Sequence, residues 1–133
     1  MKDRIRKIER IRQVQQHMHR VAELRMSGLE NSRRINQSEQ LDLISALNED
    51  SSLQGLFVDA TARRLKSLAH QGDQIATECL AQRTVVIERG LQLKRTEKTC
   101  DRLKEHDRRE TEKRELQNIL EQIISRSHKL PAS

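Results

Sequence analysis

The sequence predicts an all-α protein, an elongated antiparallel coiled-coil hairpin of two helices in which the second helix is the longer. The chain is rich in helix-forming residues and contains only four glycines and one proline among 133 residues. Small or apolar residues also recur every seven positions in its second half, as in a helix that lies along another helix. We expect one hairpin over residues 1–133, with helices at about 3–48 and 52–129 joined by a turn at about 49–51.

The composition argues against a thick globular core. Apolar residues make up 34% of the chain and charged residues 35%, whereas ordinary domains have about 45–50% and 25%. Phe57 is the only aromatic residue, although aromatic side chains supply much of the buried area of a typical core. High charge with low hydropathy also marks disordered chains, but those seldom keep helical spacing with so little proline and glycine. Long helices are the better interpretation.

The first helix is expected to begin near Asp3, whose carboxylate can cap the free backbone N–H groups. An apolar stripe and a seven-residue series follow. The stripe contains Ile5, Ile8, Ile11, Val14, Met18, Val21 and Leu24, and the series contains Val14, Val21, Gly28 and Ile35. Gly28 lies in a segment of low helix propensity, so a kink or a break there stays open, as does close approach of a second helix.

The polar residues from Asn48 to Ser52 are the clearest interruption, and Ser51 with Gln54 fits a capping box at the start of the second helix. The seven-residue series of that helix is Leu65, Gly72, Cys79, Val86, Leu93 and Cys100, with companions Leu68, Ile75, Gln82, Arg89, Thr96 and Leu103. A break at Gly72 would give a four-helix alternative, at about 3–26, 32–48, 52–70 and 74–129. The series passes through Gly72 without a shift, which favours the hairpin.

The second helix should extend beyond its partner. A turn centred near Ser51 places Asp3 opposite a residue near position 98, so the helix is expected to be uncovered from there on. An apolar patch at 116–124 follows a run of purely polar residues, and we interpret it as a binding surface or a site of self-association. The patch contains Leu116, Ile119, Leu120, Ile123 and Ile124.

The formal net charge of +6 suits an anionic partner such as nucleic acid, a membrane surface or an acidic protein. Nucleic acid is not expected, because no aromatic residue lies near the basic clusters to stack on a base and no basic-region zipper signature is present. The chain shows no signal segment or membrane span, and on one helix Cys79 and Cys100 would be about 30 Å apart, too far for a disulfide. These features favour a reducing, cytoplasmic location.

No pattern in the sequence indicates an enzyme. The five histidines are scattered, and no metal-binding, phosphate-binding or calcium-loop motif is present. His106 beside Asp107 could be an acid–base pair, but in a solvated charged run it is better interpreted as a surface histidine. We therefore expect no catalytic residue, no metal and no cofactor.

The basic opening Ile5–Arg12 and the charged run Glu97–Glu110, continuing to Leu116, resemble the FliJ/YscO family of flagellar and type III secretion export proteins. Members of that family resemble the coiled-coil stalk subunit of rotary ATPases. The resemblance implies a cytoplasmic protein, peripheral at the inner-membrane export apparatus through its partners. It would insert its paired helix termini into the hexameric ring of the export ATPase, promote ring assembly, and contact the export gate and export chaperones. The resemblance does not distinguish a flagellar from a virulence-type system.

On this hypothesis the ring-facing surface is basic and comes from both helix termini. Its predicted residues are Arg4, Arg6, Arg10, Arg12, Lys104, Arg108, Arg109, Lys113 and Arg114. Two other functions stay open. The chain could be a generic coiled-coil scaffold or export chaperone that dimerises through 116–124, or a basic coiled coil associated with nucleic acid, which a steep salt dependence of binding would mark.

Overall fold

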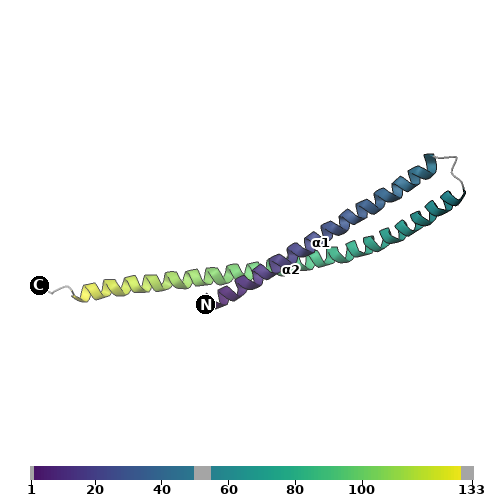
Figure 1. Ribbon diagram of the computed structural model, residues 1–133. Helices are drawn as coiled ribbons and strands as arrows, with labels where there is room; N and C mark the ends of the chain where they lie inside the picture. The colour runs from purple at the N-terminus through teal and green to yellow at the C-terminus, as the bar shows by residue number, and fades with distance from the viewer. Residues whose placement is uncertain (1, 50–54, 130–133) are drawn as a thin grey trace. The chain divides into compact units, whose positions relative to one another are not determined.

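The computed structural model describes residues 2–49 and 55–129, which form two helices (Figure 1). Helix α1 spans Lys2–Glu49 and helix α2 spans Gly55–Lys129. The described residues contain no strand, and the two helices pack against each other. The predicted helical hairpin with a longer second helix is therefore confirmed. The predicted capping box of Ser51 and Gln54 lies outside the described residues.

The two predicted break points, Gly28 and Gly72, do not interrupt the helices. Gly28 lies inside α1, and Gly72 and Gly90 lie inside α2. No described glycine has a positive φ angle, so the backbone at all three is ordinary helix. The four-helix alternative, with breaks near Gly28 and Gly72, is thus not the structure of residues 2–49 and 55–129.

The chain forms two compact units. We call Gln15–Leu91 the hairpin unit, since it contains the part of each helix nearer the turn. We call Met1–Val14 with Gln92–Ser133 the terminal unit. Residues 2–14 and 92–129 of the terminal unit are described.

In the hairpin unit the helices run antiparallel. The Gln82 side-chain amide donates to the carbonyl oxygen of Ala22 at 3.0 Å, and the Asn36 amide donates to the carbonyl oxygen of Leu68 at 2.9 Å. Moving forward along α1 from Ala22 to Asn36 thus moves backward along α2 from Gln82 to Leu68. The two steps are equal in length, so the pairing keeps one register over about two heptads.

The contact stripe of α2 agrees with the sequence prediction. Leu68, Cys79, Gln82, Thr96 and Cys100 are buried. The other seven positions of the predicted series are half-buried. These seven are Leu65, Gly72, Ile75, Val86, Arg89, Leu93 and Leu103. Every position of α2 that the seven-residue period assigned to the contact is therefore buried or half-buried.

The contact stripe of α1 differs from the predicted one. Val14, Val21, Leu24 and Ile35 are exposed, as is Gly28. Ile5 and Ile8 of the predicted stripe do lie in the contact, and six of its twelve members are polar or small. Such residues can bond to the neighbouring helix, as Asn36 does, or let it approach closely. The buried or half-buried members at heptad spacing are Ile5, Ile8, Arg12, Gln15, His19, Ala22, Met26, Leu29, Asn36, Gln40, Leu43 and Leu47.

The terminal unit corrects the expected end of the pairing. Lys2 and Asp3 lie beside His106 and Asp107, with which they line a common pocket, rather than opposite position 98. Burial along α2 continues to Glu110, which is half-buried, and all residues from 111 to 128 are exposed. The uncovered part of α2 therefore begins after residue 110. The error arose from the assumed turn centre, because a small shift of the turn displaces every pair along the helices.

Candidate partner-binding surface

All nine basic residues predicted to bind a partner belong to the terminal unit. The structure separates them into three groups: two that bind Glu9 of α1, two that form ion pairs along α2, and five whose side chains are unpaired among the described residues. This division could not be made from the charge count, because it depends on where the acidic side chains lie.

Glu9 of α1 is the centre of the first group. Its Oε1 atom accepts hydrogen bonds from the Cys100 thiol at 3.0 Å and from the Lys104 ammonium at 2.5 Å. Its Oε2 atom accepts from Arg12 at 2.8 Å. One carboxylate thus joins α1 to α2 and engages two of the predicted residues, Arg12 and Lys104. We therefore remove both from the set available to a partner.

The bonds at Glu9 shift the proton affinities of the groups involved. Hydrogen bonds from Cys100, then Lys104 and Arg12, lower the pKa of Glu9 to about 2. The same carboxylate raises the pKa of the Cys100 thiol, with burial adding to the effect, and raises the pKa of Lys104. At neutral pH the cluster is therefore an ionised carboxylate held by a neutral thiol and two cations.

Arg108 and Arg109 form the second group, on the exposed surface of α2. Arg108 pairs with Glu105 at 2.6 Å and with Glu112 at 2.5 Å, and Arg109 pairs with Glu105 at 3.2 Å. The hydrogen bond from Arg108 lowers the pKa of Glu105. Pairs at these spacings stabilise a helix modestly. They support α2 at the point where α1 stops covering it.

The third group consists of predicted residues that are exposed and whose side chains make no ion pair or hydrogen bond with any residue of 2–49 or 55–129. Its members are Arg4, Arg6, Arg10, Lys113 and Arg114. Three lie on the first turns of α1 and two on the uncovered part of α2. An unpaired cation needs no rearrangement before it meets an anionic partner, so these five are the best candidates for contact.

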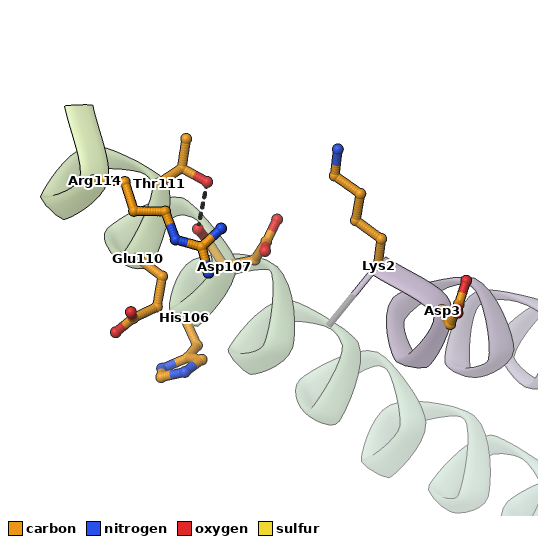
Figure 2. A pocket seen from close by; sticks show the side chains of 7 residues that line it. All are labelled: Lys2, Asp3, His106, Asp107, Glu110, Thr111 and Arg114. Atoms are coloured by element: carbon orange, nitrogen blue, oxygen red, sulfur yellow. Dashed lines mark hydrogen bonds between the residues drawn. The ribbon is translucent and has the colours of Figure 1, made fainter. Parts of the chain in front are cut away.

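A pocket of about 700 Å³ lies where α1 begins (Figure 2). It is lined by Lys2, Asp3, His106, Asp107, Glu110, Thr111 and Arg114. Figure 2 shows His106 and Glu110 on one side of α2 and Thr111 on the other, where its hydroxyl donates to the carbonyl oxygen of Asp107 at 2.9 Å. The described part of the chain contains no cluster of three metal-ligating side chains. The pocket is an open notch of mixed charge.

The uncovered segment of α2, residues 111–128, is exposed on all faces. Its predicted apolar patch lies within it, and Leu116, Ile119, Leu120, Ile123 and Ile124 are 53–59% exposed. We call these five the C-terminal stripe. Contiguous apolar side chains of this kind mark interaction sites in many proteins. The terminal unit thus combines free cations, a mixed-charge notch and an exposed stripe.

Sequence reasoning missed Glu9, which decides which predicted residues are occupied. The available signal was its position as a lone glutamate among six cations in residues 2–12, with Cys100 on the contact stripe of α2.

No known protein family, curated protein or solved structure matches the chain. Neither described helix has a segment long and apolar enough to cross a membrane.

Proposed function

We propose that the chain is a non-enzymatic stalk component of a flagellar or type III protein export apparatus, which binds the ring of the export ATPase through its terminal unit. The uncovered segment 111–128 is the observation that carries the proposal. A helix that enters a ring must present every face to the surrounding subunits, and this segment is exposed on every face.

The charges support the same role. Arg4, Arg6, Arg10, Lys113 and Arg114 are exposed and unpaired among the described residues, and they flank the point where α1 stops covering α2. Exposed cations steer an anionic partner and give contacts that form and break quickly. In this role the chain promotes assembly of the ATPase hexamer. Its remaining surface would contact the export gate and export chaperones in the cytoplasm, at the inner membrane.

Charge reversal tests the proposal. We expect the full chain to stimulate ATP hydrolysis and hexamer formation by the export ATPase of the same organism. The double variant Lys113→Glu, Arg114→Glu should lose the stimulation. The matched control is Arg63→Glu, Lys66→Glu, which makes the same change of charge at two exposed residues of the hairpin unit. Equal loss in both double variants would indicate unspecific charge attraction and would reject the proposed surface.

The C-terminal stripe favours a second candidate, a coiled-coil scaffold or export chaperone that dimerises through 116–124. Two copies could cover the five half-exposed apolar side chains of the stripe. Sedimentation equilibrium distinguishes the candidates. A dimer that is lost in Ile123→Asp, with no effect of the chain on the ATPase, would favour the scaffold.

A further inference from the structure

A second heptad stripe runs along α1 within the hairpin unit. Met18, Val21, Arg25 and Gly28 follow one another at steps of three and four residues, beside the stripe that contacts α2. Val21 is 51% exposed, and Met18 is half-buried. Helices with two such stripes commonly pack against two neighbours. The hairpin unit supplies α1 with one neighbour, which leaves this outer stripe without a partner in the described structure.

The outer stripe forms one wall of a groove of about 480 Å³. Ala22 and Gln82 belong to its lining and are buried between the helices. The apolar lining continues with Met18 and Val21 from α1 and Val85 from α2. The other lining residues are His17, Arg25 and Arg89. The lining thus combines four apolar side chains with Gln82, His17 and two arginines, and it includes no acidic side chain.

Gly28 extends the outer stripe by one turn, and packing within the described hairpin does not require a glycine there. A Cβ atom built at Gly28 would have no heavy atom within 4 Å. At Gly72 and Gly90, by contrast, the corresponding atom would meet Asn36 and His19 at 2.6 and 3.2 Å. Glycine lowers helix stability relative to alanine, and packing within the hairpin explains it at Gly72 and Gly90 but not at Gly28. A glycine on an outer helix face allows close approach of another helix.

We propose that this groove binds an amphipathic helix of a partner protein, one that has a narrow apolar stripe flanked by acidic residues. The charged residues of the groove indicate which kind of partner it binds. A second copy of the hairpin docking through the same groove would bring together two surfaces that carry arginine and no acidic side chain, and like charges at an interface oppose association. Glutamate or aspartate beside the apolar stripe of the incoming helix would pair with Arg25, which is exposed.

This inference goes beyond the proposed stalk function and does not depend on it. The groove belongs to the hairpin unit, whereas the ring-binding residues belong to the terminal unit. The test therefore needs no ATPase, and a failure of either proposal leaves the other standing.

Synthetic peptides provide the probe. A fluorescein-labelled peptide of about three heptads carries leucine at the contact positions and glutamate on both flanks. A second peptide has lysine in place of every glutamate, and a third has serine in place of every leucine. Fluorescence anisotropy with the full chain should show saturable binding of the glutamate peptide, at least about tenfold tighter than of either other peptide.

Variants locate the site. Val21→Asp should weaken binding of the glutamate peptide at least about tenfold. Ile87→Asp is the matched control, because Ile87 is 56% exposed on α2 and is not among the residues lining the groove. Arg25→Glu should reverse the preference, so that the lysine peptide binds more tightly. Circular dichroism checks that each variant remains helical, and Arg25→Glu decides the question if Val21→Asp unfolds.

Three results would overturn the proposal. The glutamate and lysine peptides could bind equally, which would remove the role of charge. Val21→Asp and Ile87→Asp could have the same effect, which would place binding elsewhere. Sedimentation could instead show self-association that is lost in Val21→Asp, and the occupant would then be a second copy of the chain.

Discussion

Asn36 and Gly72 face each other across the hairpin, and the missing side chain of the glycine makes room for the asparagine amide. The Asn36 amide donates to the Leu68 carbonyl oxygen at 2.9 Å, and its own Oδ1 accepts from Gln40 at 2.6 Å. Asn36 is 5% exposed, so these bonds satisfy a polar group that would otherwise be costly to bury. A bonded polar residue in a coiled-coil contact fixes the register of the helices.

The two glycines Gly72 and Gly28 should respond oppositely to alanine. At Gly72 the new methyl group would meet Asn36 Oδ1 at 2.6 Å and disturb its bonds, so Gly72→Ala should lower the free energy of unfolding by about 1–2 kcal/mol. At Gly28 the methyl group enters open space, so Gly28→Ala should raise that free energy by about 0.5–1 kcal/mol. Urea titrations measure both. A stabilised Gly72→Ala would contradict the packing described for Asn36.

Acid should weaken the terminal unit through Glu9. The pKa of Glu9 is lowered to about 2 in the folded chain from an ordinary value of 4.5, so the unfolded chain binds this proton more readily. The stabilising contribution is complete above about pH 4.5 and is lost as the pH falls toward about 2. The stability difference between wild type and Glu9→Gln should therefore shrink over that window in urea titrations.

The control for Glu9 is Glu115→Gln, because Glu115 is exposed and makes no ion pair with a described residue. The pH dependence of stability should change less in Glu115→Gln than in Glu9→Gln. A constant difference for Glu9→Gln would show that the carboxylate does not join the helices in solution.

The Cys100 thiol should be alkylated slowly, and Glu9 should control the rate. The hydrogen bond to Glu9, burial and the nearby negative charge all raise the pKa of Cys100. Alkylation by iodoacetamide requires the thiolate, so the rate at neutral pH should be low. In a Cys79→Ala background, Glu9→Gln should move the midpoint of the rate against pH to a lower pH. An unchanged midpoint would mean that Glu9 does not contact the thiol.

The contact stripe of α2 could be predicted because its members are mostly apolar or small and keep a strict seven-residue period. Leu68 and Cys79 are typical of them, and both are buried. The stripe of α1 was predicted only in part, at Ile5 and Ile8, because apolarity pointed to Val21 on the outer face while the true contact uses Ala22 and Asn36. The hydrogen bond to the Leu68 carbonyl oxygen makes Asn36 suitable for burial, and hydropathy alone does not reveal such bonds.

The basic residues of the candidate site could be predicted from the sequence, but their ion pairs and hydrogen bonds could not. Counting cations in the two helix termini found the residues that surround the uncovered segment. It could not show that Glu9 binds Lys104 and Cys100, since those bonds depend on the register of two distant segments. The same register error placed the start of the uncovered helix near position 98 rather than after Glu110.

The most direct measurement is the effect of the chain on ATP hydrolysis and hexamer formation by the export ATPase, with and without residues 112–133. The deletion begins beyond Glu110, after which all residues to position 128 are exposed, so the remaining hairpin should stay folded by circular dichroism. The account predicts stimulation by the full chain at near-equal molar amounts and none by the shortened chain. Equal stimulation by both would contradict the claim that the uncovered helix is the end that enters the ring.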